Sequence, residues 1–362
     1  DAKNELHREI LFVKETNDLI SIWEGSKLSK RQATISSGIK TVYWLEEFES
    51  IFSQLMEEST HFYYNNNEHY RQAVVMETRE DRFLKMIKSS YPDHKLLPNF
   101  PIMESLRGVK EVEEIKLIKT ACDITEKGFR RILGFVKPGV MEYEIEAEYA
   151  HEFLRNRSKG FAYTPIIGSG YNACVLHYIE NNQECKDGDL LLMDVAAEYA
   201  NYSSDMTRTI PVSGRFTARQ KAVYQAVLNV KNEATKLLAP GIMWDAYHVE
   251  VGKLMTSELL TLGLIDKADV QNEDPKWPAY KKYFMHGTSH HMGLDTHDFG
   301  TLKSPMQSNM VFTVEPGIYI PEENMGIRLE DDVVIQTSGY PVNLMQNIPI
   351  EIDEIESLMK SN

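Results

Sequence analysis

The 362-residue sequence predicts a two-domain protein: a smaller α/β domain over residues 1–104, followed by an α+β domain over residues 105–362. Two observations support this prediction. Residues 1–98 alternate short apolar runs with amphipathic helical stretches, which is the pattern of an α/β fold. In the second domain, a unit of helix, PG(V/I)M and helix occurs twice, 102 residues apart, which indicates internal duplication.

The elements of the first domain follow from its hydrophobic pattern. ILFV at 10–13 predicts a strand, whereas residues 41–56 and 81–91 have the spacing of amphipathic helices. HFYYNNNEHY (61–70) predicts a strand that runs into a loop. The two prolines of LLPNFPIMES (96–105) predict a linker between the domains.

The second domain is predicted to begin with a long amphipathic helix over 109–136, which PGVM separates from a helix over 143–156. A similar helix over 217–238 is followed by PGIM and by a helix over 244–263. Strand-like segments follow each pair of helices. The two units together therefore predict an internally duplicated α+β domain.

Composition narrows the classes of function. A formal net charge of −15 disfavours binding to nucleic acid or to an anionic membrane, because phosphates would be repelled. No apolar run approaches the roughly 20 residues that span a bilayer. The three cysteines, Cys122, Cys174 and Cys185, fit neither a disulfide framework nor a CxxC metal spacing and predict reduced thiols in a cytoplasmic protein.

Two aspartates interrupt a predicted hairpin over 189–212. With its turn centred on Tyr199–Ala200, Asp194 lies opposite Asp205. Facing like charges inside apolar strands are destabilising, and a divalent cation between them would turn the repulsion into a ligand set. The alternative is that one aspartate is solvated or pairs with Arg208.

Two glutamates interrupt later strands. Glu315 lies in the apolar segment NMVFTVEPGIYI, and Glu330 lies in GIRLEDDVVI on the same strand face as Arg328. The simpler alternative is that each is an edge residue facing water. The neighbours Asp331 and Asp332 are interpreted as a solvated loop edge or as ion-pair partners. Because four acidic residues interrupt predicted apolar strands in one domain, a functional site is favoured over four unrelated edge residues.

Four of the eleven histidines lie in MHGTSHHMGLDTHD (285–298). His286 and His290 have the i, i+4 spacing of a zinc-binding helix, but the GTS between them lacks a glutamate base and forms helices poorly. We therefore expect one histidine to join a carboxylate-rich pair of metals rather than a site of histidines alone. Oxygen-dominated ligation with one imidazole suits Mn²⁺, with Co²⁺ and Zn²⁺ as alternatives.

The order of these blocks is similar to a known family. Two aspartates separated by ten residues in MDVAAEYANYSSDMTRT precede MHGTSHHMGLDTHD, TVEPGIY and GIRLEDD, and YNACVLHYIENN (171–182) adds a fifth block. Together they resemble the metallopeptidases of the pita-bread fold, most closely the Xaa-Pro aminopeptidases (aminopeptidase P), with the prolidases next. The resemblance implies a pita-bread catalytic domain over 105–362, preceded by an N-terminal domain that lacks its first strands and helices.

The resemblance also implies roles for particular residues. The five ligands of a dinuclear metal centre would be Asp194, Asp205, His290, Glu315 and Glu330. The residues that face the substrate would be His177, His286, His297, Tyr319 and Arg328. Asp205 and Glu330 would bridge both ions. His291 matches no functional position and is interpreted as a packing or surface residue.

In the mechanism that the resemblance implies, Glu315 takes a proton from the attacking water and passes it to the leaving proline nitrogen. His297, with His177 as a second candidate, would hydrogen-bond the developing oxyanion. The predicted enzyme is a metalloexopeptidase that releases the first residue of peptides with proline at the second position. We expect it to be a cytoplasmic homodimer.

Three alternatives use related folds. A prolidase would cleave only dipeptides, and a methionine aminopeptidase is usually a bare catalytic domain. A non-catalytic pita-bread module would bind histones, nucleic acids or partner proteins. Such modules typically lack the metal ligands, whereas all five are present here. The segment SHHMGLDTHD and the compact spacing between blocks favour the aminopeptidase over the prolidase.

Overall fold

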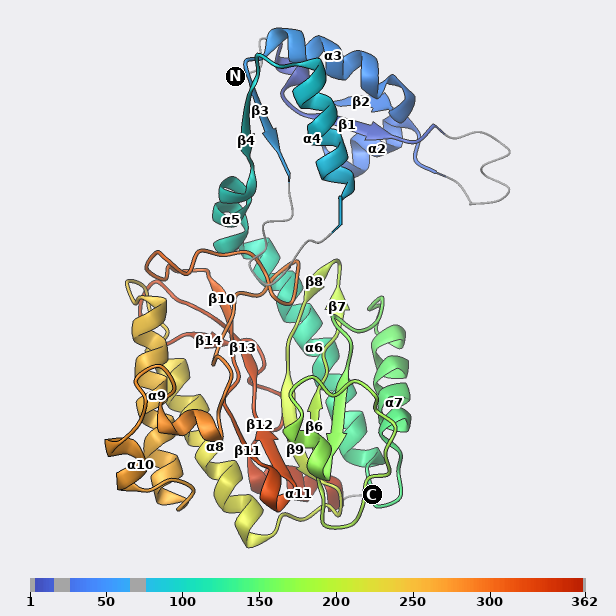
Figure 1. The fold of residues 1–362 in the computed structure, drawn as a ribbon. Helices are drawn as coiled ribbons and strands as arrows, with labels where there is room; N and C mark the ends of the chain where they lie inside the picture. The colour runs from blue at the N-terminus through green and yellow to red at the C-terminus, as the bar shows by residue number, and fades with distance from the viewer. Residues whose placement is uncertain (1–3, 16–26, 66–75, 361–362) are drawn as a thin grey trace. The chain divides into compact units, whose positions relative to one another are not determined.

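The computed structural model describes residues 4–15, 27–65 and 76–360, and the chain forms two compact units, residues 1–101 and 102–362 (Figure 1). The division falls inside helix α5 (Phe100–Gly108). The boundary that the sequence predicts, after residue 104, lies in the same helix and remains a proposal. Within the described ranges, no helix is long and apolar enough to cross a membrane.

The described part of the first unit is made of parallel strand pairs and amphipathic helices. Strand β1 (Ile10–Val13) pairs with β2 (Thr41–Trp44), and β3 (His61–Tyr64) pairs with β4 (Lys95–Pro98). The helices are α2 (Lys30–Ser37), α3 (Phe48–Glu58) and α4 (Arg79–Ser90), with 3₁₀ turns η1 (Glu5–His7) and η2 (Leu45–Glu47). Side-chain oxygens of Ser29 and Thr78 cap the starts of α2 and α4.

Aromatic side chains join the helices of the first unit to its strands. Phe52 of α3 stacks on Phe48 with ring centroids 5.3 Å apart and contacts Phe83 of α4 at 5.6 Å. The ring of Phe62 in β3 meets Phe52 edge-on at 6.0 Å. Such ring pairs add to the free energy gained from burying their area, so they hold this small unit together.

Two segments of the first unit differ from their predictions. The helix predicted over 41–56 begins only at Phe48, because the β-branched and aromatic residues Thr41–Trp44 pair with β1 as a strand. The linker predicted over 96–105 instead forms β4 and the start of α5. Pro101 lies in the first turn of α5, where its missing N–H leaves no hydrogen bond unmade. The predicted loop over 66–70 lies outside the described residues.

The second unit repeats a pair of packed helices followed by antiparallel strands. The first pair is α6 (Val112–Phe135) and α7 (Glu142–Arg155), and the second is α8 (Ala218–Leu237) and α9 (Trp244–Thr261). Figure 1 shows the two pairs on opposite sides of the strands. Each pair is joined by a turn in which a glycine has positive φ, 92° at Gly139 and 90° at Gly241. The predicted duplication is confirmed.

The strands of the second unit are antiparallel. One sheet has the order β5 (Ile166–Ser169), β6 (Leu190–Asp194), β9 (Thr207–Pro211), and another has the order β10 (Val311–Val314), β13 (Asp331–Val334), β14 (Val342–Asn343). Two further pairs are β7 (Glu198–Tyr199) with β8 (Tyr202–Ser203) and β11 (Gly317–Ile320) with β12 (Met325–Arg328). The remaining elements are α10 (Lys267–Gln271), α11 (Ile352–Lys360), η3 (Gly170–Cys174), η4 (Ala279–Lys282) and η5 (Pro321–Glu323).

The hairpin over 189–212 has a different register from the predicted one. Its turn is Ala200–Asn201, whose φ angles are 51° and 70°, because this pair adopts the left-handed conformation that a tight hairpin needs. Asp194 therefore pairs with Thr207, and the prediction that it lies opposite Asp205 is wrong. The register differs by two residues, and two residues restore the same strand face, so Asp205 remains on the side of Asp194.

Candidate metal centre

Asp205, His290 and Glu330 form a buried cluster whose candidate ligand atoms all lie within 4.8 Å of one another. They come from distant parts of the second unit. Asp205 precedes β9, His290 precedes β10, and Glu330 joins β12 to β13. Two carboxylates and an imidazole at this spacing are a donor set that holds divalent cations in proteins.

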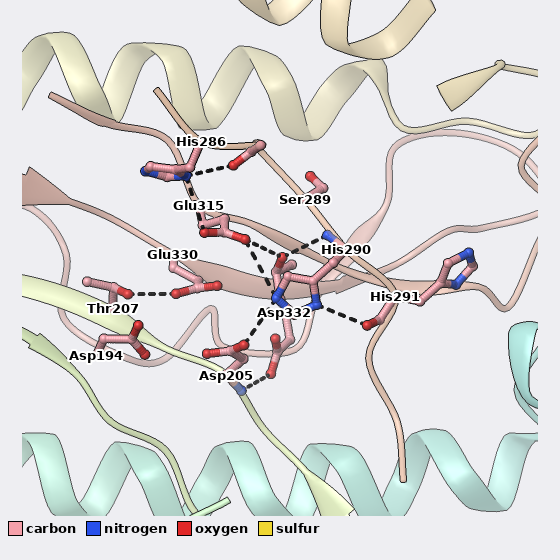
Figure 2. Close-up of polar contacts among 12 residues, drawn as sticks. Asp194, Asp205, Thr207, His286, Ser289, His290, His291, Glu315, Glu330 and Asp332 are labelled. Carbon is pink, nitrogen blue, oxygen red and sulfur yellow. Dashed lines mark hydrogen bonds and ion pairs between the residues drawn. The ribbon is translucent and has the colours of Figure 1, made fainter. Parts of the chain in front are cut away.

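Asp194, at the end of β6, and Glu315, just after β10, extend the cluster, and Figure 2 shows these side chains directed toward it. Nε2 of His290 lies 3.3 Å from Oδ2 of Asp205 and 3.6 Å from Oε1 of Glu315. Nδ1 of the same ring lies 2.9 Å from the main-chain oxygen of His291, which leaves Nε2 facing the carboxylates. The structure therefore brings together the five residues predicted as metal ligands.

The electrostatics of the cluster favour a bound cation. Burial raises the pKa of Asp194, raises that of Glu330 well above its ordinary value, and raises that of Glu315 to about 7. The negative charge of Asp205 adds to all three shifts. A divalent cation would oppose them, because it favours ionised carboxylates. The residues present thus fit a metal centre of carboxylates and one imidazole.

Hydrogen bonds hold two of these carboxylates from behind. Oγ1 of Thr207 donates to Oε2 of Glu330 at 2.6 Å (Figure 2). The Tyr163 hydroxyl donates to Oδ1 of Asp194 at 2.5 Å. Contacts of this kind fix the orientation of ligand side chains around a metal.

The acidic pair after Glu330 is buried, so of its two interpretations the solvated loop edge is wrong, and the alternative of an ion-pair partner is confirmed for Asp331. Asp331 forms ion pairs with Arg208, at 2.6 Å, and with Lys231. Arg208 therefore pairs with Asp331 and with neither aspartate of the hairpin. Oδ2 of Asp332 accepts the backbone N–H of Asp205 at 3.0 Å, which supports the cluster from below in Figure 2.

Sequence reasoning missed three of these supporting residues. Thr207 follows Asp205 by two positions, and Asp332 follows Glu330 by two positions, so strand alternation could have placed each on the side of the candidate ligand. Tyr163 lies before β5 and carries no local signal, because only the tertiary fold brings its hydroxyl to β6.

A hydrogen-bonded chain leads from His286 to Asp194. Nε2 of His286 lies 2.8 Å from the Tyr319 hydroxyl. Arg328 donates to the same hydroxyl at 2.9 Å and to Oδ2 of Asp194 at 2.6 Å. Burial, followed by the charge of Arg328, lowers the pKa of His286 to about 3, so this ring is neutral near pH 7. Three residues predicted to face the substrate thus form one connected group.

The other histidines have different surroundings. The ring of His297 meets that of His290 edge-on, with centroids 4.3 Å apart, so it borders the cluster. His291 is buried, with its ring 4.4 Å from Phe312 and nearly parallel to Trp244, and its interpretation as a packing residue is confirmed. His177 is exposed on the segment after η3.

Comparison with known proteins identifies the family. Residues 116–337 match the profile of "Metallopeptidase family M24", and residues 1–63 match that of "Aminopeptidase P, N-terminal domain". The chain belongs to metallopeptidase family M24. Its M24 segment contains all five candidate ligands. The N-terminal match accords with the prediction of a separate α/β domain ahead of the catalytic one.

Relatives and solved structures are similar over nearly the whole chain. The Xaa-Pro aminopeptidase of Haemophilus influenzae is 33% identical over 98% of this chain and 82% of that protein. Proline aminopeptidase P II from Yersinia pestis has a TM-score of 0.85 at 31% identity, covering 98% of this chain and 84% of that chain. Zinc-substituted Escherichia coli aminopeptidase P in complex with product has the same TM-score and identity, with 97% and 82% covered. These similarities confirm the predicted family and pita-bread fold class.

Proposed function

We propose that this M24 protein is a metal-dependent Xaa-Pro aminopeptidase, which hydrolyses the bond before a proline at the second position of a peptide. The observation that carries the proposal is the convergence of four carboxylates and one imidazole from separate strand ends in one buried cluster (Figure 2). The relatives named Xaa-Pro aminopeptidase support the same activity and do not favour a prolidase.

The cluster is proposed to hold two divalent ions. Mn²⁺ suits its oxygen-rich donors best, with Co²⁺ and Zn²⁺ as alternatives. Asp205 and Glu330 would bridge the two ions, Asp194 would complete one ligand set, and His290 and Glu315 the other. Bound divalent ions supply Lewis acidity and lower the pKa of a reacting water.

Glu315 is proposed to move the proton during hydrolysis. Its Oε1 lies 3.6 Å from Nε2 of His290 and its Oε2 lies 3.6 Å from Nδ1 of His286, so the carboxylate faces both the cluster and the substrate side. It would accept a proton from the attacking water and return it to the leaving proline nitrogen. His297, with His177 as a second candidate, would donate hydrogen bonds to the developing oxyanion.

His286, Tyr319 and Arg328 are proposed to border the pocket for the proline ring. The Tyr319 hydroxyl contacts both neighbours, so the three side chains hold one another in a single arrangement. A pre-arranged wall of this kind orients a substrate without losing further side-chain freedom when the substrate binds.

Hydrolysis of matched peptides tests the proposal. The purified chain is freed of metal, supplied with Mn²⁺, Co²⁺ or Zn²⁺, and incubated with Gly-Pro, with a longer Xaa-Pro-Xaa peptide, and with the same peptide carrying alanine in place of proline. We expect release of the first residue from the longer proline peptide and little from the alanine control. Cleavage of the dipeptide alone would identify a prolidase, and cleavage of none would contradict the proposal.

The homodimer and the cytoplasmic location expected from the sequence remain predictions. Size-exclusion chromatography with light scattering tests the first: a dimer gives twice the mass of the chain. A mass equal to that of one chain at the concentrations used for the peptide assay would contradict it.

A further inference from the structure

His297 lies on the segment 292–300, which contains no helix or strand. A side chain that donates a hydrogen bond to developing charge needs a fixed position, because misplaced donors lose most of their effect. Such a segment must therefore be held by contacts with the rest of the unit. Backbone hydrogen bonds provide part of this: the N–H of Met292 donates to the main-chain oxygen of Val311 at 3.2 Å, the N–H of Ser203 donates to that of Gly293 at 2.8 Å, and the N–H of Asp298 donates to that of His291 at 2.9 Å.

Two basic residues near the junction of α5 and α6 hold the segment through its acidic side chains. Arg107 pairs with the exposed Asp295 at 2.6 Å, and both basic residues pair with the buried Asp298. Nζ of Lys110 lies 3.2 Å from Oδ2 of Asp298, and Nη2 of Arg107 pairs with Oδ1. The N–H of Phe299 also donates to Oδ1, at 2.8 Å, so both carboxylate oxygens are engaged. The side chains of Lys110 and Asp298 are each 1% exposed, and that of Arg107 is 15% exposed. We call Arg107, Lys110 and Asp298 the Asp298 clamp.

The neighbouring residues fit closely around the Asp298 clamp. A Cβ at Gly293 would lie 2.2 Å from Oδ2 of Asp298 and 2.8 Å from Cε of Lys110, so a larger residue would displace the ion pair. The guanidinium of Arg107 lies 4.4 Å from the ring centroid of Phe299. The clamp thus holds the segment on both sides of its histidine.

Stability alone does not account for a buried ion pair at this position. Desolvation of the two charges offsets most of their attraction, and an apolar pair of similar volume is often as stable or more so. A buried ion pair can, however, select one arrangement of the two chain segments to which its residues belong. Asp298 is joined directly to His297, whose ring centroid lies 4.3 Å from that of His290.

We propose that the Asp298 clamp positions the imidazole of His297 against the candidate metal centre. Lys110 and Asp298 are positioning residues in this scheme, because they act through His297. The inference rests on the proposed function, in which His297 donates to the oxyanion. It adds the reason why the chain buries a lysine and an aspartate so far apart in sequence.

Histidine NMR of the zinc-loaded full chain tests the position of the ring independently of activity. With ¹³C-labelled histidine, the signal that His297→Ala removes belongs to His297. We expect Lys110→Met and Asp298→Asn each to shift or broaden that signal. Lys110→Arg keeps the positive charge, so its His297 signal should match that of the parent chain. The matched control is Lys221→Met, which removes a lysine paired with Glu356 at 2.9 Å and should leave the signal in place.

Two NMR results would overturn the proposal. One is an unmoved His297 signal in both Lys110→Met and Asp298→Asn. The other is an equal change of every histidine signal, since that would report a general loosening of the unit and not the position of one ring.

Peptide hydrolysis gives a second readout that distinguishes positioning from a general structural role. Lys110→Met is expected to lower kcat about 10- to 100-fold with little change in KM. It should add little to the loss already present in His297→Ala, because both changes act on the same group. Equal losses in the two backgrounds would contradict the inference. A parent chain without hydrolysis would contradict the proposed function instead, and the NMR experiment would still decide the position of the ring.

Discussion

The two units of the chain differ in whether they bury ion pairs: the pairs described in the first unit lie at the surface, whereas the second unit has both exposed and buried pairs. In the described part of the first unit, a pair such as Lys30–Glu47 has side chains that are 36% and 41% exposed. In the second unit, the side chains of Arg208 and Asp331 are 0% and 2% exposed. Burying a charged pair costs desolvation free energy, whereas a surface pair stays largely hydrated and does not incur this cost. The difference teaches that only the second unit, which contains the candidate metal centre, buries ion pairs among the described residues, and the following experiments test that comparison.

The largest effect is expected from Glu315→Gln. The amide keeps the shape of the side chain but cannot accept a proton, so kcat should fall by about 10²- to 10⁴-fold. Circular dichroism should show an unchanged fold. The control is Glu323→Gln on the exposed turn η5, which should retain full activity. Normal turnover by the Glu315 variant would end its proposed role.

Lys231→Met tests the cost of removing one of the two cations that pair with a buried carboxylate. Lys231 pairs with Asp331 where the side chains are 5% and 2% exposed. In the variant, Asp331 would keep its ion pair with Arg208 and the hydrogen bond from the Asn343 amide at 2.7 Å, but it would lose one of its two cationic partners. We expect a loss of about 3 kcal/mol in the free energy of unfolding. Urea titration followed by circular dichroism measures it. An unchanged midpoint would show that this buried pair does not stabilise the second unit.

Metal removal is expected to lower stability by a comparable or slightly smaller amount. A ligand at 100 times its Kd stabilises the folded state by about 2.7 kcal/mol. Thermal unfolding of chelator-treated protein should therefore shift upward when Mn²⁺ is added, and Mg²⁺ at the same concentration serves as the control. Identical transitions with and without every transition metal would contradict a metal centre in this unit.

The smallest effect is expected from the exposed ion pair of the first unit. Lys30→Met removes a surface partner of Glu47, and surface pairs contribute little because solvent screens them. The urea midpoint should match that of the parent chain within error. A loss as large as that of Lys231→Met would remove the contrast between the units.

Much of the candidate site could be predicted because the sequence around each candidate ligand contains a signal of its own. Glu315, for instance, is an acidic side chain in an otherwise apolar segment, and that conflict is visible without a structure. The hairpin turn was misplaced because its first residue, Ala200, has a φ of 51°, which alanine seldom adopts. Nothing local marks Tyr163, whose partner Asp194 is reached only through the tertiary fold.

The Asp298 clamp shows the same limit more clearly. Lys110 and Asp298 are 188 residues apart, and either could be an ordinary surface charge when the sequence alone is considered. Their pairing depends on packing between the start of α6 and the segment 292–300. Residue types therefore predict which groups can do chemistry, whereas the residues that hold those groups in place emerge only from the fold.

Metal stoichiometry tests the central claim most directly, namely that the acidic strand ends of the second unit hold two divalent ions. The full chain is equilibrated by dialysis against Mn²⁺, and bound metal is measured by mass spectrometry. We predict two ions per chain, falling below two in Glu330→Gln, which weakens a residue proposed to bridge both. A parent chain that binds none of Mn²⁺, Co²⁺ and Zn²⁺, or a Glu330 variant that still binds two ions with unchanged affinity, would contradict the account.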